Sequence, residues 1–295
     1  MAELYHYTTG AGLLGMLDGY DADENPNLTM WATHYAYMND PTEYMFGINL
    51  CLPLIKEIEE EEEGVPEEDK IYPSLNEAKD LPKYWGVLEL KHWEFRGIFN
   101  PYIISFSQAR DSLHMWNMYG QNGNGLALCL DMDRIRLDKT HYLFDSCVYA
   151  ENEISIEDKE KIKDKIRPFY TERHDAYKEM KHRFRDEQQN IAKTFLFAPF
   201  IYAGVASYVK HRAYIEEREY RMLAYGSKDT FFRERNGEIV PYKKENIAFE
   251  ALQYIIVGPT RDFERTRNSI LLLFGQKGIS WSPEKIIQSE VPYNG

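Results

Sequence analysis

The sequence predicts an α+β fold, because strand patterns and helical patterns alternate irregularly along its 295 residues. The strand patterns are rich in aromatic and β-branched residues and are bounded by turn residues. They cover residues 4–9, 28–33, 101–107, 126–131, 254–257 and 286–291. No repeat or linker composition divides the chain, so we expect a single domain over residues 1–295.

The first expected strand carries His6 and runs directly into a helix. Gly10 and Gly12 lead into the apolar positions of this helix, and Thr8 or Thr9 is placed to cap it. An imidazole beside the free amides of a helix N-terminus suits an anionic or nucleotide ligand. The alternative interpretation is a core strand with one half-exposed histidine.

Residues 101–131 predict a strand, a short helix, a glycine turn and a second strand. The first strand ends in Ser105-Phe106-Ser107, and the helix carries Trp116 and Tyr119. This order of elements brings Ser105, Ser107, Trp116 and Tyr119 close together in space.

Two acidic segments follow the second expected strand. Asn39 or Asp40 is placed to cap a helix that begins near Glu43, although three converging polar groups also allow a functional interpretation. The glutamate-rich stretch 55–70 predicts a solvated helix end and loop. It does not predict a metal site, because consecutive glutamates on a helix point in different directions.

Residues 151–209 predict a helical insertion into the mixed sheet. Nine Lys or Arg and only four acidic residues lie between Lys161 and Arg185. This excess indicates a solvated helix with ion pairs and leaves open a face for a partner or a nucleic acid. The apolar stretch 195–209 is expected to pack in the core. It is shorter than the ~20 residues of a membrane span and contains Pro199.

The segment 210–223 holds the most promising carboxylates. Glu217, Glu219 and Arg221 alternate, which predicts a strand with these side chains on one face. Two close carboxylates raise each other's pKa unless a cation pairs with them, and Arg221 can supply that cation. The alternative interpretation is a charged edge strand.

Composition narrows the functional classes. The net charge of −13 argues against broad electrostatic capture of nucleic acid. Cys51, Cys129 and Cys147 have no paired spacing, so we expect buried free thiols and a reducing compartment. With no signal-peptide pattern, we expect a cytoplasmic protein without membrane contact. The histidines lack paired ligand spacing, so no metal site is predicted.

In combination, these motifs resemble the bacterial domain-of-unknown-function family 2971, over nearly the whole chain. The family usually shows tryptophan before the glutamates, where this chain has Tyr214. That family in turn distantly resembles the ADP-ribosyltransferases, which implies an ADP-ribosyltransferase-like mixed β core. The motifs that carry the resemblance are Tyr5-His6-Tyr7-Thr8, Asn39-Asp40-Pro41-x-Glu43, Ser105-Phe106-Ser107, Trp116-x-x-Tyr119, Gly123 to Gly125, Lys210 and Glu217-x-Glu219-Tyr-Arg221.

The resemblance implies NAD as co-substrate and a role for each candidate site residue. Glu219 would be the catalytic glutamate and Glu217 the carboxylate on the acceptor side. His6 would hold the nicotinamide-side ribose, in a His-x-Thr opening similar to that of DNA-targeting ADP-ribosyltransferase toxins. The remaining cofactor-binding positions would be Tyr7 and Thr8 beside His6, Ser105 and Ser107 along the nicotinamide pocket, and Trp116 or Tyr119 stacked on nicotinamide.

These residue types suit cleavage of the nicotinamide–ribose bond, which develops oxocarbenium-like charge on the sugar. The resemblance implies a transferase that modifies protein, RNA or DNA as a toxin or antiphage effector, with a neutralising antitoxin as a candidate partner. Two alternatives stay open. One is a catalytically inactive module that binds NAD or ADP-ribose. The other is a nucleic-acid-processing enzyme that uses the carboxylates with Mg²⁺.

Overall fold

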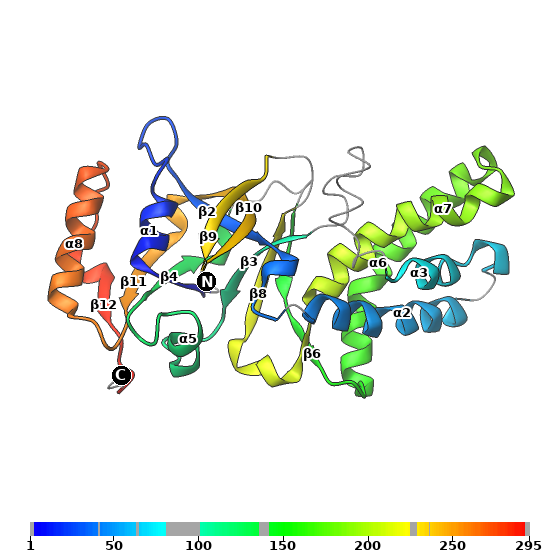
Figure 1. Ribbon diagram of the computed structural model, residues 1–295, viewed down its shortest axis with the longest axis horizontal. Helices are drawn as coiled ribbons and strands as arrows, with labels where there is room; N and C mark the ends of the chain where they lie inside the picture. Colours follow the sequence, from blue (N-terminus) through cyan, green and yellow to red (C-terminus); the bar gives the residue numbers. More distant parts are fainter. Residues whose placement is uncertain are drawn as a thin grey trace.

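The computed structural model describes residues 3–40, 42–62, 65–80, 101–135, 142–224, 229–235 and 237–292. Ten of its strands form one mainly antiparallel sheet, accompanied by several helices. Figure 1 shows this sheet at the left and centre of the molecule and a group of helices at the right. The predicted α+β class is confirmed, whereas the extent of the single domain stays a prediction.

The sheet follows the order β12-β11-β4-β1-β3-β2-β10-β9, and β8 and β5 extend it from β3. Neighbouring strands are antiparallel, except that β11 and β12 are parallel. The strands are β1 (Glu3–Thr8), β2 (Asn27–His34), β3 (Tyr102–Ser107), β4 (Leu126–Asp131), β5 (Tyr142–Ser146), β8 (Glu219–Ala224), β9 (Phe231–Arg235), β10 (Glu238–Ala248), β11 (Leu252–Val257) and β12 (Ile286–Gln288). A separate parallel pair joins β6 (Val148–Ala150) and β7 (Val209–His211).

The sheet divides at β3. One edge of β3 pairs with β8 along its whole length. The other edge is shared, because β1 pairs at Ser107 and β2 pairs at Tyr102 and Ile103. The carbonyl of Ser105 lies between these two pairings, and Nδ1 of His6 donates a hydrogen bond to it over 3.0 Å. The imidazole therefore satisfies a main-chain acceptor where the two strands diverge.

The helices form two groups. α1 and α8 lie at the sheet end of the molecule, and α2, α3, α6 and α7 gather at the opposite end (Figure 1). Thr9 caps α1 by accepting a hydrogen bond from the Gly12 amide, as one of the two predicted caps. The helices are α1 (Gly10–Met16), α2 (Glu43–Glu61), α3 (Tyr72–Ala78), α5 (Leu113–Met118), α6 (Ile156–Met180), α7 (Asp186–Ala198) and α8 (Phe263–Gln276).

Each group of helices has its own apolar core. Leu4, Phe106 and Leu128 of the sheet pack with residues of α1 and α8. The second core lies among α2, α3, α6 and α7, so the helical layer contains more than the predicted insertion at 151–209. Gln188–Tyr208 is long and apolar enough to cross a membrane, but 80% of its apolar window is buried in the fold. This burial is expected of a core helix.

The glutamate-rich stretch was predicted to be a solvated helix end and loop, and this prediction is wrong for its first part. α2 continues to Glu61, and the buried Glu59 accepts a hydrogen bond from the Ile71 amide over 2.6 Å. Nζ of Lys163 on α6 lies 2.9 Å from Glu57 and 2.6 Å from Glu61. Glu57, Glu59 and Glu61 are therefore partnered, and basic residues of α6 face two of them.

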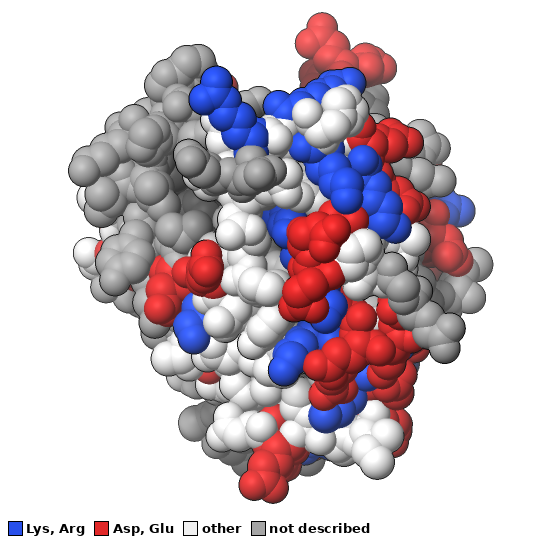
Figure 2. Space-filling model, turned by 90° about the vertical axis from the view of Figure 1, so that its right-hand side faces the viewer, with Lys and Arg blue, Asp and Glu red and all other residues white. Residues whose placement is uncertain are grey.

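Part of the basic excess of α6 is thus used within the fold, because Lys159, Lys163 and Arg167 pair with glutamates of α2. Figure 2 shows the helical side of the molecule, where basic side chains lie next to acidic ones over much of the coloured surface. This favours the ion-paired helix over a nucleic-acid face.

Replacing Lys163 should weaken the packing of α6 on α2. Lys163 is only 3% exposed, so Lys163→Met leaves Glu57 and Glu61 without this partner and should lower the free energy of unfolding by about 2 kcal/mol. Urea unfolding of the variant measures the change. Lys161→Met is the matched control, since Lys161 is exposed and pairs on the surface. Equal losses in the two variants would contradict the account.

Candidate active site

The two predicted carboxylates do not share a strand. Glu217 ends a 3-10 helix, Arg212–Glu217, and Glu219 begins β8. Between them Arg218 takes a left-handed conformation with φ of 41°. The strand prediction is therefore wrong at Glu217, because the alternating pattern does not reveal the turn at Arg218. β8 also lies between β3 and β5 in the sheet, so the alternative interpretation of this segment as a charged edge strand is excluded as well.

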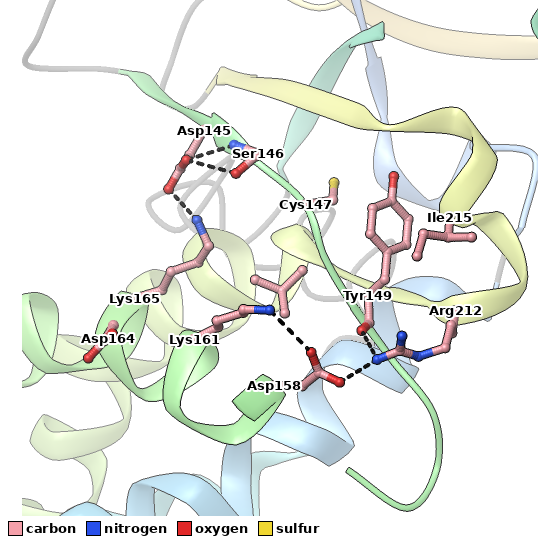
Figure 3. Close-up of a pocket in the computed structure, with 11 residues that line it drawn as sticks. Asp145, Ser146, Cys147, Tyr149, Asp158, Lys161, Asp164, Lys165, Arg212 and Ile215 are labelled. Atoms are coloured by element: carbon pink, nitrogen blue, oxygen red, sulfur yellow. Dashed lines mark hydrogen bonds and ion pairs between the residues drawn. The ribbon is translucent and has the colours of Figure 1, made fainter. Parts of the chain in front are cut away.

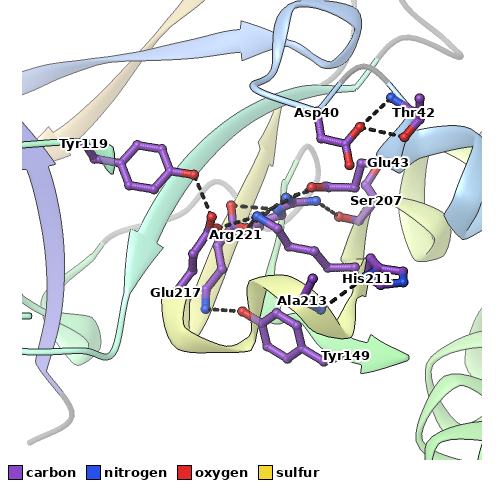
Figure 4. Close-up of polar contacts among 12 residues, drawn as sticks. Asp40, Thr42, Glu43, Tyr119, Tyr149, Ser207, His211, Ala213, Glu217 and Arg221 are labelled. Atoms are coloured by element: carbon purple, nitrogen blue, oxygen red, sulfur yellow. Dashed lines mark hydrogen bonds and ion pairs between the residues drawn. The ribbon is translucent and has the colours of Figure 1, made fainter. Parts of the chain in front are cut away.

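Both glutamates nevertheless belong to one buried group of charges. We call the side chains of Glu43, Lys210, Glu217, Glu219 and Arg221 the charge cluster; none is more than 8% exposed. They come from α2, β7, the 3-10 helix and β8 (Figure 4). With all five side chains ionised, three carboxylates and two cations give the cluster one net negative charge.

Glu219 is the most strongly held carboxylate of the charge cluster. Nε and Nη2 of Arg221 each lie 2.8 Å from one of its oxygens, and Nζ of Lys210 lies 2.7 Å from Oε2. Burial alone would raise the pKa of Glu219. The charges of Arg221 and Lys210 and their hydrogen bonds outweigh burial and lower this pKa to about 2.

Glu43 and Glu217 complete the charge cluster. Arg221 donates to Glu43 through Nη2, and Nζ of Lys210 lies 3.5 Å from Glu43 Oε2. Lys210 also donates to Oε2 of Glu217. The other oxygen of Glu217 accepts a hydrogen bond from the Tyr119 phenol over 2.9 Å.

Main-chain contacts fix the two glutamates in place. Oγ of Ser107 donates to the carbonyl of Glu217 over 2.6 Å and accepts from the Ala109 amide over 2.9 Å. The Tyr149 hydroxyl accepts from the amide of Glu219 over 2.7 Å (Figure 4). The site is thus held by both strands and turns, as a preorganised site requires.

The residue before α2 differs from the predicted cap. Thr42 is the N-cap, and its side chain makes no capping hydrogen bond. Asp40 accepts from the Thr42 amide over 2.8 Å, so it contacts the N-cap residue and not the first amides of the helix. Glu43, at the start of α2, joins the charge cluster instead, which favours the functional interpretation for this residue. Pro41 of the same motif lies outside the described residues.

Four of the predicted site residues come together: Ser107, Tyr119, Glu217 and Glu219. Ser105 pairs with Arg221 across β3 and β8, and its buried hydroxyl has no hydrogen-bond partner among the described residues.

Trp116 and Tyr7 have structural contacts instead. Trp116 is fully buried, donates from Nε1 to Asp111 over 2.8 Å, and packs edge-on against Tyr7 with ring centroids 4.9 Å apart. The Tyr7 hydroxyl donates to the carbonyl of Ala109 over 2.9 Å. Both rings therefore belong to the core beside the site, and no face of Trp116 is exposed for a ligand to stack on.

His6 lies on the opposite face of the sheet from Glu219. Tyr5, Ser107 and Glu219 form one row across β1, β3 and β8, so they share a face and the next residue, His6, points away. Its ring contacts Phe106 at a centroid distance of 5.9 Å. Burial lowers the pKa of His6 below its usual 6.5, so the imidazole is neutral at pH 7. The structure does not bring His6 to the carboxylates.

Thr8 follows two residues later on the same face as His6. It is buried, and its hydroxyl would lie 2.1 Å from a side chain at Gly12. Glycine at position 12 therefore permits the close approach of α1 to β1.

An open pocket with a volume of about 590 Å³ lies beyond Tyr149 (Figure 3). Its wall includes the aromatic ring of Tyr149 and two ion pairs, Arg212 with Asp158 and Lys165 with Asp145. This pocket could not be predicted from the sequence, since its residues follow no recognisable motif. In the described part of the chain, no group of three or more His, Cys, Asp or Glu could hold a metal ion.

Comparisons with known proteins give one match to a family model and no protein of known activity. Residues 115–222 match the model of a family described as "Protein of unknown function (DUF2971)". The match supports the family predicted from the motifs, and it contains Tyr119, Lys210 and both glutamates. The search of curated proteins and the search of solved structures gave no match.

Acid should weaken the fold through Glu219. Its pKa of about 2 lies below the 4.5 of a free side chain, so its contribution is complete above about pH 5 and is lost as the pH falls toward 2. In Glu219→Gln the free energy of unfolding should be lower at pH 7, by about 3 kcal/mol, and should change less between pH 5 and 2. Urea unfolding at several pH values measures both effects.

Glu216→Gln is the control for this titration, because Glu216 is exposed and adjacent to the charge cluster. It should keep the acid sensitivity of the original protein. A Glu219→Gln variant with unchanged acid sensitivity would show that Glu219 is not held ionised.

Proposed function

We propose that the protein is an NAD-dependent ADP-ribosyltransferase that modifies a protein, an RNA or a DNA in the cytoplasm. One observation carries the proposal. Two carboxylates paired with cationic side chains, Glu217 and Glu219, lie beside Tyr119 and Ser107 at the start of a strand of a divided, mainly antiparallel sheet. The resemblance to ADP-ribosyltransferases, and to their Glu-x-Glu pattern, supports the same activity.

The chemistry needs a negative group close to the sugar. In the proposed reaction the bond between ribose C1′ and the nicotinamide nitrogen breaks, and its electron pair leaves with nicotinamide. A nucleophile of the acceptor then bonds to C1′ and releases its proton to water. Positive charge develops on the sugar between these events, and a fixed carboxylate stabilises it. Arg221 and Lys210 keep the Glu219 carboxylate ionised at neutral pH.

The proposal assigns no substrate contact to Trp116 or Tyr7, whose rings pack in the core. The role predicted for His6, holding a ribose, stays a prediction. The contacts of the charge cluster do not support it, because the His6 side chain points to the other face of the sheet. Its observed contact, from Nδ1 to the Ser105 carbonyl, stabilises the division of the sheet. A toxin or antiphage role and a neutralising antitoxin follow from the resemblance alone and belong to this proposal.

A binding module without catalysis is the second candidate. It is favoured by the burial of the charge cluster, in which Lys210 and Arg221 already occupy the carboxylates. Such a module would bind NAD or ADP-ribose and release no nicotinamide. The Mg²⁺-dependent alternative has weaker support, because the three carboxylates of the charge cluster are bound by cationic side chains.

Label transfer from NAD⁺ distinguishes these candidates. Incubation of the pure protein with adenylate-labelled NAD⁺ and a bacterial lysate should place label on a macromolecule, and nuclease or protease treatment identifies its class. At least one of the Glu217→Gln and Glu219→Gln variants should lose the transfer, whereas Glu216→Gln should retain it.

Binding of NAD⁺ without release of nicotinamide would replace the transferase by the binding module. Cleavage of nucleic acid that needs Mg²⁺ and no NAD⁺ would replace it by the nucleic-acid enzyme. A transferase of known activity, added to the same lysate, shows that the assay detects transfer.

A further inference from the structure

The six carboxylate oxygens of the charge cluster are not equivalent. Both oxygens of Glu219 and both oxygens of Glu43 contact Arg221 or Lys210. Oε2 of Glu217 contacts Lys210. The sixth oxygen, Oε1 of Glu217, contacts the neutral phenol of Tyr119. With all five side chains ionised the cluster has one more negative than positive charge, and this oxygen is the one that pairs with no cation among the described residues.

We propose that Glu217, and not Glu219, is the carboxylate that contacts the sugar of the substrate, and that Tyr119 covers it in the resting protein. This inference rests on the proposed function and reverses the roles that the resemblance implies for the two glutamates. A developing positive charge is stabilised most by the carboxylate oxygen that is least neutralised. Both oxygens of Glu219 already accept hydrogen bonds from cationic side chains, so both are partly neutralised.

Tyr119 is suited to act as a displaceable cover. It is the C-cap residue of the six-residue helix α5, and its side chain is only partly buried. Burial and the Glu217 carboxylate raise the pKa of Tyr119, so the phenol is a neutral donor at pH 7. A hydroxyl of ribose is also a neutral O–H donor. It can therefore replace the phenol at Oε1 without disturbing the ion pairs.

Glu219 then acts as a positioning residue. Its three charge-assisted hydrogen bonds hold Lys210 and Arg221, and Lys210 in turn fixes the other oxygen of Glu217. Loss of Glu219 should therefore lower stability strongly and catalysis moderately. Loss of Glu217 should do the reverse, since it removes only one ion pair and one hydrogen bond with a phenol.

The experiment measures nicotinamide release, NAD⁺ binding and thermal stability in parallel, with the full chain. Glu217→Gln should reduce kcat by about 100-fold or more and should melt near the original protein. Glu219→Gln should melt at a clearly lower temperature and, at a temperature where it is folded, reduce kcat by less than about tenfold. Tyr119→Phe should keep kcat within a few-fold and lower KM, because the cover loses its hydrogen bond. Glu216→Gln controls for charge.

Each outcome decides between the inference and the proposed function. An active Glu217→Gln variant beside an inactive, folded Glu219→Gln variant would overturn the inference and leave the transferase standing. If the original protein binds NAD⁺ without releasing nicotinamide, the transferase fails. In that case, weaker NAD⁺ binding by the Glu217→Gln variant, with unchanged binding by the folded Glu219→Gln variant, would still support the inference. Weaker binding by Glu219→Gln and unchanged binding by Glu217→Gln would overturn it. Absence of both binding and release would overturn both.

Discussion

The paired hydrogen bonds between Arg221 and Glu219 are the contact on which the rest of the structure depends. Both side chains are buried, with 1% and 4% of their surfaces exposed. Burial of charges is costly unless their geometry is good and their remaining polar atoms are satisfied. Here Arg221 also donates to Glu43 and to the carbonyl of Ser207, and Lys210 completes the contacts of Glu219.

The same contacts join the two halves of the fold. Arg221 and Glu219 belong to β8 of the sheet, whereas Glu43 begins α2 and Ser207 lies near the end of the apolar helical segment. Each half has its own apolar core. The charge cluster therefore lies where the two cores meet, and its ion pairs fix the helical layer against the sheet. A reaction that uses one of these carboxylates must leave the pairs intact.

Much of the fold could be predicted from the sequence, where apolar residues dominate an element. The strands around His6, Ser105 and Leu128 are confirmed. The hairpin of β9 and β10 was missed, because β10 contains a proline and three consecutive charged residues, 243–245, which obscure its alternation. Two of these, Lys243 and Glu245, are buried in the structure.

The candidate site could be predicted only in part, because its geometry depends on contacts between distant segments. The motifs identified Tyr119, Glu217 and Glu219, which do meet. Glu43 was interpreted mainly as part of a helix start, since nothing near it in the sequence indicates a cationic partner more than 160 residues away. The opposite orientation of His6 follows from the strand register of β1 on β3, which the sequence does not specify.

The most direct test of the account is a crystal structure of the Glu217→Gln variant with NAD⁺ bound. The account predicts that the nicotinamide-side ribose lies within hydrogen-bond distance of residue 217, that Tyr119 has moved away from it, and that Arg221 still holds Glu219. A dinucleotide bound elsewhere, with Tyr119 still in contact with residue 217, would contradict the assignment of Glu217 as the carboxylate that acts on the sugar.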